Sequence, residues 1–223
     1  MSELLGHARL VADFAVSNGA LEFPTPNRQP VRHMGALLAD SVLQAGLNYR
    51  SVVRPRVERI YALYPSAHTT SGILKLIDTI GTSEFLMWGH NVKIARFERL
   101  LNFLHSKDID TTAVLRSYLL NDEFCDDLLN VNGVGPKTVD YLSCLVGLDS
   151  VAVDRHVKLF VKNAGVEASD YDTVKIIFSY AADLLNIPRR AFDAWVWEFI
   201  SQRSSASEQF SLFHRSGATA LVG

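Results

Sequence analysis

The chain has few of the residues that build metal clusters or disulfide frameworks. Its 223 residues include only two cysteines, Cys125 and Cys144, which lie far apart in the sequence. Iron–sulfur clusters and cysteine-only zinc sites take about four cysteine ligands, and small disulfide-stapled domains need several cysteine pairs. The sequence therefore predicts no iron–sulfur cluster, no disulfide framework, and two reduced cysteines with structural roles.

Long hydrophobic runs are also missing. Hydrophobic residues make up 48% of the chain, but no apolar run approaches the ~18 residues of a membrane-spanning helix. The first segment, "MSELLGHARLVADFAVSNG", lacks the charged, apolar and small-residue order of a signal peptide and is interpreted as an amphipathic helix. We expect a soluble protein without a membrane partner. Its expected location is cytoplasmic.

A strong charge of either sign is absent as well. The formal net charge is −2 at pH 7, which argues mildly against a protein that coats nucleic acid. A nearly neutral chain can still carry one basic face. Net charge therefore leaves the class of partner open.

Alternating apolar and polar residues, the sign of β-strands, are scarce. Apolar residues recur instead at three- and four-residue steps in stretches such as "MGALLADSVLQAGL" and "DTVKIIFSYAADLL", the period of an amphipathic helix. The short "SVAV" before Asp154 is predicted to be a buried approach to a helix rather than a strand. The predicted fold class is all-α, with about nine to eleven helices. We expect order to fade beyond Arg203, where the sequence turns polar and serine-rich.

The most informative stretch is "NVNGVGPKTVDYLSCLVGLDSVAVDRHV", residues 130–157. A short helix is predicted just before it, with Phe124, Leu128 and Leu129 on one face. Pro136 suits the first position of the next helix, and Gly147 suits its end. The predicted unit, at about residues 121–147, is a helix–hairpin–helix. Its glycines let backbone amides at a helix N-terminus face outward, which suits an anion such as a nucleic-acid phosphate.

The glycine turn permits other interpretations. A nucleotide-binding P-loop requires glycine directly before the lysine, but Pro136 stands there and no strand precedes the turn. The dinucleotide-binding fingerprint fails for the same lack of a strand. A tight interhelical turn without any ligand stays open on these residues alone.

Lys137 and Asp154 each permit a structural and a catalytic interpretation. A lysine at a helix start faces the positive end of the helix dipole, which favours the neutral amine that nucleophilic attack requires. A solvated surface charge is the alternative. Asp154 directly before "RHVKLFV" suits a helix N-cap, and that role does not exclude catalysis. One helix and a short return separate the two residues, so both helix starts could face one cleft.

The segments "NGVGPKT" and "AVDRHV" together resemble the signature of the endonuclease III superfamily of DNA glycosylases, also called HhH-GPD. Weaker similarity extends over residues 31–203. The resemblance implies two helical subdomains with a cleft between them. Residues 33–149 would form one subdomain, residues 1–32 with 150–203 the other, and residues 204–223 a polar tail. No cysteine cluster follows Trp197, so the chain resembles the members that lack the iron–sulfur module.

The resemblance also implies a reaction. The protein would be a bifunctional DNA glycosylase and abasic-site lyase of base-excision repair. Lys137 would attack the sugar C1′ of a damaged nucleotide, displace the base and form a Schiff base. Asp154 would activate the lysine or stabilise positive charge on the sugar. Family members without the lysine use water, so Lys137 predicts strand cleavage by β-elimination.

The same resemblance implies how DNA is held. The amides of Gly133, Val134 and Gly135 would bind a phosphate 3′ of the lesion, and Gln44 would fill the space left by the flipped base. A monovalent cation, Na⁺ or K⁺, would bridge to this phosphate, and no other cofactor is required. Its expected ligands are backbone carbonyls, those of Leu129, Val131 and Val134.

The expected partner is double-stranded DNA with a damaged base or abasic site, bound by a monomer. The alternative function is a non-catalytic helix–hairpin–helix DNA-binding protein, which would need neither Lys137 nor Asp154. Which damaged base is removed does not follow from the sequence, because the walls of such a pocket come from scattered helices.

Several further residues invite a weaker prediction. His156 has no clustered metal-ligating partner in the sequence, so we predict a solvated histidine. Tyr141 is predicted to be a partly buried helix aromatic, with a place in the pocket as the alternative. Core packing is predicted for the tryptophans, Trp88, Trp195 and Trp197. A basic helix is predicted to carry Arg50, Arg54, Arg56 and Arg59. These arginines could contact a DNA backbone, and the alternative is that Arg54, beside Pro55, simply flanks the start of a helix.

Overall fold

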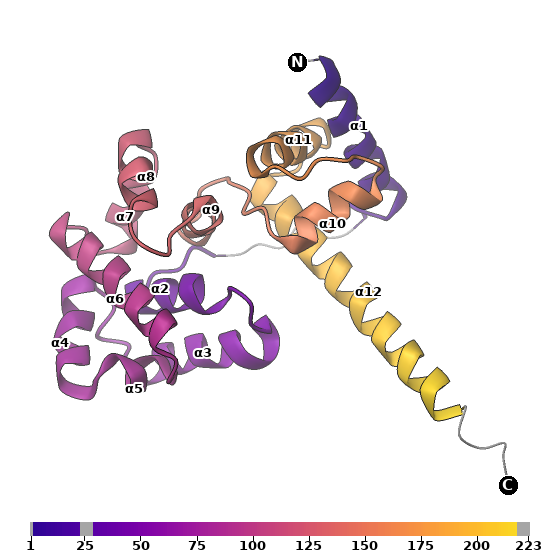
Figure 1. Cartoon of the computed structure of the whole chain (residues 1–223). Helices are drawn as coiled ribbons and strands as arrows, with labels where there is room; N and C mark the ends of the chain where they lie inside the picture. The colour runs from indigo at the N-terminus through magenta and orange to yellow at the C-terminus, as the bar shows by residue number, and fades with distance from the viewer. Residues whose placement is uncertain (1, 23–28, 218–223) are drawn as a thin grey trace, which may run out of the picture. The chain divides into compact units, whose positions relative to one another are not determined.

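The computed structural model describes residues 2–22 and 29–217, with side chains described through residue 203. The described residues form twelve α-helices and one π-helical turn, and no strand occurs among them (Figure 1). The all-α prediction is confirmed, but the helices are more numerous than expected. Short helices such as α5 (Thr82–Leu86) have too few turns to show a periodicity in the sequence. In this described part, no helix is both long and apolar enough to cross a bilayer.

The chain divides into two compact units. The central unit comprises Arg28–Ala152, and the terminal unit comprises Met1–Asn27 and Val153–Gly223. The sequence placed these divisions at residues 33 and 149. Residues 30 and 31 belong to the central unit because the amide of Val31 donates to the carbonyl of Leu145 at 2.9 Å. Pro30 also packs so close to Gly147 that a Cβ on this glycine would lie 2.8 Å from the proline ring.

The central unit is built around helix α2 (Met34–Leu43), in which every residue is buried. Helices α3, α4, α6 and α9 all pack against it. Buried leucine and phenylalanine side chains such as Leu37, Leu38 and Phe97 form the core, each contributing about 1.5–3 kcal/mol by burial. The other elements are η1 (Tyr49–Val53), α3 (Arg54–Leu63), α4 (Thr70–Ile80), α5, α6 (Asn91–Ser106), α7 (Thr112–Tyr118), α8 (Asp122–Leu129) and α9 (Pro136–Leu145).

The terminal unit packs α1 (Ser2–Ser17) on α11 (Tyr171–Leu184), and α10 (Arg155–Asn163) on α12 (Arg189–Gly217). Its core is aromatic: Phe160 lies edge-on to Phe192 and Trp195, whose own rings stack. Trp195 is 8% exposed, which confirms core packing for this tryptophan.

Helix α12 continues beyond Arg203 to Gly217, where the sequence predicted that order fades. The described backbone is helical there, and the fading of order stays a prediction. Serine-rich composition suggested a loop, but no glycine or proline interrupts the segment before residue 217, so nothing in it forces the helix to end. Residues 218–223 of the predicted tail lie outside the described residues.

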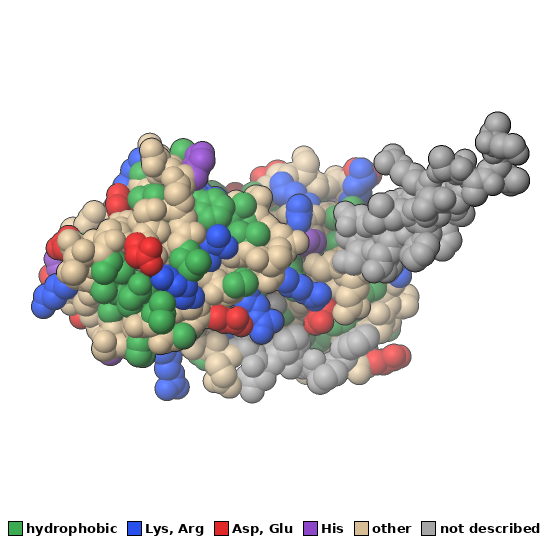
Figure 2. All heavy atoms as spheres, turned by 90° about the horizontal axis from the view of Figure 1, so that it is seen from below, with side chains coloured by type: hydrophobic (Ala, Val, Ile, Leu, Met, Phe, Trp, Pro, Cys, Tyr) green, Lys and Arg blue, Asp and Glu red, His purple; other side chains and the backbone are tan. Residues whose placement is uncertain are grey.

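Charged side chains are mixed on the face of the molecule shown in Figure 2. Blue Lys and Arg side chains alternate with red Asp and Glu side chains there, rather than forming one continuous basic surface. This mixture agrees with the net charge of −2. On this face, a basic site for an anionic partner is therefore limited to local clusters of residues.

Candidate active site

Residues 121–147 form the predicted helix–hairpin–helix in the central unit. Asn121 caps α8 by accepting the amide of Phe124, and Pro136 occupies the first turn of α9. At the end of α9, Leu148 donates to the carbonyl of Ser143 at 2.9 Å and Gly147 has a φ of 88°. This is the glycine-ended cap that the sequence predicted. Leu129 departs from the prediction because it is 38% exposed at the last residue of α8, away from the face that buries Phe124 and Leu128.

The hairpin turn leaves two of its three predicted phosphate-binding amides unused. Gly133 has a φ of +91°, a conformation that L side chains rarely adopt. The amides of Gly133 and Gly135 donate to no group in the described part of the chain, and both can serve an anion. The amide of Val134 instead donates to the carbonyl of Val131 at 2.9 Å, and its side chain is buried. Val134 thus closes the turn in this structure, and its predicted contact with a phosphate stays a prediction.

The predicted cation ligands are the backbone carbonyls of Leu129, Val131 and Val134. The carbonyl of Val131 already accepts the amide of Val134, and a carbonyl oxygen keeps a second lone pair for a cation. Side chains offer no alternative: among the described residues, no three His, Cys, Asp or Glu groups come together to hold a metal ion. A cation at the hairpin remains a proposal.

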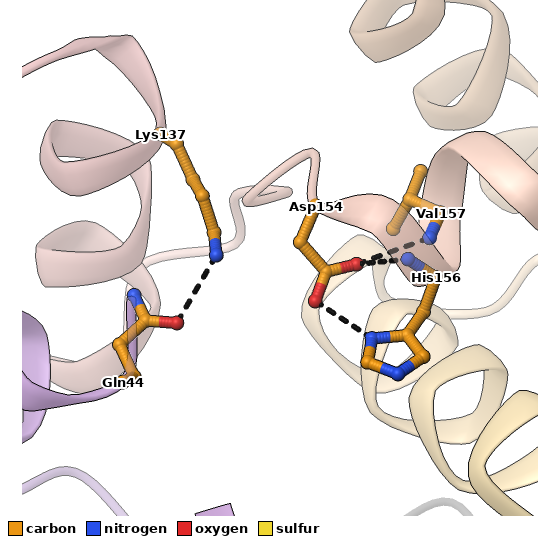
Figure 3. Close-up of polar contacts among 5 residues, drawn as sticks. All are labelled: Gln44, Lys137, Asp154, His156 and Val157. Carbon is orange, nitrogen blue, oxygen red and sulfur yellow. Dashed lines mark hydrogen bonds and ion pairs between the residues drawn. The ribbon is translucent and has the colours of Figure 1, made fainter. Parts of the chain in front are cut away.

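Lys137 lies in the first turn of α9 and is half-buried. Its Nζ donates a hydrogen bond of 3.2 Å to Oε1 of Gln44, as Figure 3 shows. Gln44 is the C-cap of the core helix α2, so its backbone is held by the centre of the unit. The structure thus brings together two predicted site residues that lie 93 positions apart in the sequence.

A second contact joins the same two helices one turn deeper. The hydroxyl of Tyr141 donates to Oδ1 of Asp40 at 3.0 Å, and the hydroxyl of Tyr49 donates to Oδ2 at 3.2 Å. Asp40 is only 4% exposed, so these donors satisfy a buried carboxylate. Tyr141 is the partly buried aromatic that the sequence favoured. Because residues 40 and 44 pair with 141 and 137, the register of α2 against α9 is set.

Lys93 of α6 supports the end of α2 from the other side. Its ammonium donates to three backbone carbonyls, those of Val42 at 2.9 Å, Leu43 at 3.3 Å and Ala45 at 2.8 Å. A cation at a helix C-terminus interacts favourably with the helix dipole. Burial lowers the pKa of Lys93, and the charge of Arg96 lowers it further. Lys93 thus holds the backbone that presents Gln44.

Asp154 belongs to the terminal unit and caps helix α10. Its Oδ1 accepts the backbone amides of His156 at 2.7 Å and Val157 at 3.1 Å, while Oδ2 lies 2.9 Å from Nδ1 of His156 (Figure 3). The carboxylate thus combines the N-cap role that the sequence favoured with a side-chain contact that it did not reveal.

The prediction that His156 is a solvated histidine is wrong. Its side chain is only 14% exposed, and its ring lies edge-on to Trp197 with 6.1 Å between the ring centroids. The reason is local: the cap turn folds the imidazole back onto the carboxylate two residues earlier. A histidine two positions after a capping aspartate was the available signal.

The predicted basic helix is mostly engaged within the protein. Arg54 pairs with Glu58 at 2.7 Å, and Arg59 pairs with Glu84 at 2.7 Å. Arg56 donates to two backbone carbonyls and lies over the ring of Trp88. These three arginines therefore offer less free positive charge than their sequence suggested.

Two other arginines, on α6, lie at the hairpin, and the sequence interpretation missed them. Arg99 donates from Nη1 to the backbone carbonyl of Asn132 at 3.2 Å. The guanidinium of Arg96 lies against Gly133, where a Cβ would come within 2.6 Å of Nε. Basic residues at three-residue steps in "VKIARFER" were the signal that could have found them.

Comparison with known proteins places the fold and the family. One similar solved structure is that of the H. pylori 3-methyladenine DNA glycosylase (MagIII) bound to 1,N6-ethenoadenine. It is 20% identical in sequence, with a TM-score of 0.63, and the match covers 88% of this chain and 98% of that one. At this identity the similarity shows a shared fold. No curated protein matches the chain. A family pattern does match residues 89–201, just over half of the sequence, and the chain therefore belongs to the family described as "Domain of unknown function (DUF8548)".

Proposed function

We propose that this protein is a DNA glycosylase of base-excision repair that also acts as an abasic-site lyase. The observation that carries the proposal is the placement of Lys137, in the first turn of the second hairpin helix and bonded to Gln44 at 3.2 Å. The hairpin beside it keeps the amides of Gly133 and Gly135 available for a phosphate. The fold, shared with a protein described as a DNA glycosylase, supports the same class of reaction.

In the proposed reaction, the amine of Lys137 attacks C1′ of a damaged nucleotide. The bond from C1′ to the base breaks with its electron pair, and the base leaves after taking up a proton. Opening of the sugar ring gives a Schiff base, and loss of a proton from C2′ then expels the 3′ phosphate. The Gln44 contact orients the lysine before attack, because a single neutral acceptor holds the amine without fixing a proton on it.

Asp154 has the chemistry of an electrostatic stabiliser in this proposal. Three N–H donors orient its carboxylate, which is 19% exposed, within the first turn of α10. A fixed negative charge of this kind stabilises the positive charge that develops on the sugar. The proposed Na⁺ or K⁺ at the hairpin carbonyls would add positive charge beside the phosphate, and its replacement by a large organic cation should weaken DNA binding.

Borohydride trapping tests the lysine directly. Wild-type protein is incubated with duplexes that carry a panel of damaged bases or an abasic site, and borohydride reduces any Schiff base to a stable adduct. We expect an adduct with wild type and none with Lys137→Gln. The matched control is Lys107→Gln, which removes an exposed lysine paired with Asp127 and should trap normally.

Each trapping outcome separates one part of the proposal. Absence of an adduct with every substrate would show that the lyase chemistry is wrong, and base release without an adduct would leave a glycosylase that uses water. An adduct with Lys137→Gln would mean that another amine reacts. The second candidate, a non-catalytic DNA-binding protein, is favoured by the use of both Asp154 oxygens in capping contacts with His156 and Val157. Tight binding of abasic DNA without any base release would select it.

A further inference from the structure

Helix α6 carries three basic residues in a row, Lys93, Arg96 and Arg99, which we call the α6 basic row. Their three-residue spacing places them on neighbouring turns of one side of the helix. The buried residues of the same helix, Phe97, Leu100, Leu101 and Leu104, include positions four residues after Lys93 and Arg96, so the row borders the side of α6 that packs in the core of the central unit. Each step along the row advances about 4.5 Å along the helix axis.

The α6 basic row has no carboxylate partner in the described part of the chain. No ion pair joins Lys93, Arg96 or Arg99 to an acid. The one acidic residue of α6, Glu98, accepts a hydrogen bond of 2.6 Å from the hydroxyl of Thr82 instead. Like charges on adjacent helical turns repel, so the row destabilises the free protein. A site that keeps this repulsion is suited to an anionic ligand that relieves it.

Arg96 holds a buried donor that has no acceptor. Its Nε is shielded from solvent and makes no hydrogen bond among the described residues. Gly133 makes this close approach feasible, because the absent side chain leaves room for the guanidinium beneath the turn. Buried polar atoms are nearly always paired in folded proteins. With its Nε unpaired, Arg96 is not committed to an acceptor in the described part of the chain, and its terminal N–H groups can serve an external anion.

Arg99 is already oriented toward the same turn. Its Nη1 bonds the carbonyl of Asn132, and the side chain is otherwise exposed. A guanidinium has five N–H donors, and most of those on Arg99 remain for a second partner. Two guanidinium groups thus border the turn at which the amides of Gly133 and Gly135 are unengaged. Arginine is the side chain best matched to bidentate phosphate binding.

We propose that Arg96 and Arg99 bind phosphates of the DNA strand that the hairpin holds, extending its anion site along α6. The proposal rests on the proposed DNA partner. Lys93 has a different role within the row. Its ammonium is bonded to the three carbonyls at the end of α2, so it holds the backbone of Gln44 and attracts the phosphates only through its positive charge. The row therefore links the backbone that presents Gln44 to the hairpin, with the two phosphate contacts at the hairpin end.

The salt dependence of DNA binding tests the two arginines. Fluorescence anisotropy is measured with a duplex that carries a tetrahydrofuran abasic-site analogue, between 50 and 300 mM salt as rough limits of the titration. We expect Arg96→Gln and Arg99→Gln each to reduce the slope of log K against log salt by about 0.9, and to weaken binding about tenfold at 0.1 M salt. The matched control is Arg116→Gln, which removes an exposed arginine of α7 and should leave slope and affinity unchanged.

A further variant separates phosphate binding from packing. Arg96→Lys keeps the charge but lacks the planar fork, so it should keep most of the salt slope while losing affinity. Melting curves of all variants establish that the fold is retained. If wild type binds DNA but both Gln variants match Arg116→Gln, the arginine proposal is overturned and the proposed function stands. If wild type does not bind the abasic duplex at any salt concentration, both fail.

Discussion

The two candidate catalytic side chains are held in opposite ways. Asp154, in the terminal unit, is fixed by groups within three residues of itself, two of them backbone amides. Among the described residues, the ammonium of Lys137, in the central unit, has one hydrogen bond, of 3.2 Å to Gln44 at the end of another helix. A carboxylate fixed by its own cap suits a stationary charge. A lysine with a single, displaceable partner suits a group that must move to form a bond.

The largest expected effect comes from removing the charge of Asp154, the side chain that its own cap holds in place. Asp154→Asn should lower the rate of base release by about 10²–10⁴, the usual contribution of a positioned acid, base or charge. The helix should remain capped, because asparagine caps about as well as aspartate. Single-turnover base release and thermal melting measure the two effects separately.

Asp170→Asn is the control for this substitution. Asp170 caps α11 in the same unit through the amides of Asp172 and Thr173, so this variant changes a cap without touching the candidate site. Unchanged base release in Asp154→Asn would show that Asp154 is only a helix cap. The difference between Asp154 and Lys137 would then have no bearing on catalysis.

A smaller effect on the rate is expected when Gln44, the partner of Lys137, is replaced by a charged residue. Gln44→Glu places a carboxylate against Nζ and stabilises the protonated, unreactive ammonium. Adduct formation at pH 7 should fall by roughly tenfold and recover as the pH is raised. A trapping rate measured against pH distinguishes this from simple loss of contact, because Gln44→Ala should slow the reaction without moving the profile. Equal profiles for wild type and Gln44→Glu would show that the contact with Lys137 is not used.

The hydrogen bond between Tyr141 and Asp40, which joins the same two helices, is expected to affect stability rather than chemistry. Tyr141→Phe removes a hydrogen bond to the buried carboxylate of Asp40, and should reduce the free energy of unfolding by about 1–3 kcal/mol. Urea unfolding measures the change. Tyr118→Phe, at a tyrosine that is 40% exposed, is the control and should be nearly neutral. An unchanged free energy of unfolding in Tyr141→Phe would show that the packing of α2 against α9 does not depend on this hydrogen bond.

The smallest expected effect is a change of stability with pH at a second helix cap. His33 caps α2 as Asp154 caps α10, but with an imidazole in place of a carboxylate. His33 accepts the amide of Ala36 through Nδ1 and bonds the carbonyl of Tyr64 through Nε2. Burial lowers the pKa of His33 from its ordinary 6.5, the Tyr64 contact opposes this, and nearby His68 adds to the lowering. The unfolded chain therefore takes up the proton more readily than the native state.

Stability from the His33 cap is thus complete above pH 6.5 and is lost as the pH falls below that value. The urea midpoint should decline between about pH 7 and pH 5. Asp110 and Asp170, whose pKa values are lowered from 3.8, lose their contributions only in more acid solution. His33→Asn keeps a capping side chain, so its midpoint should decline less over this range. An identical decline would assign the pH dependence to other groups.

Features decided by neighbouring residues were predictable from the sequence. Pro136 and Gly147 mark the ends of α9, and Asp154 directly before a helical pattern marks its cap. One local feature that was missed, the contact of His156 with Asp154, lies within the same cap turn.

The sequence by itself determined the longer helices, the hairpin, and the position of Lys137 and Asp154 at helix starts, because caps and turns depend on residues a few positions apart. Only the tertiary structure decided that Gln44 meets Lys137, that Tyr141 meets Asp40, and that Arg96 lies beneath Gly133. These pairs are brought together by the burial of α2 and α6 against the hairpin. Non-directional hydrophobic packing sets that arrangement, and it leaves no local pattern in the chain from which the pairs could be read.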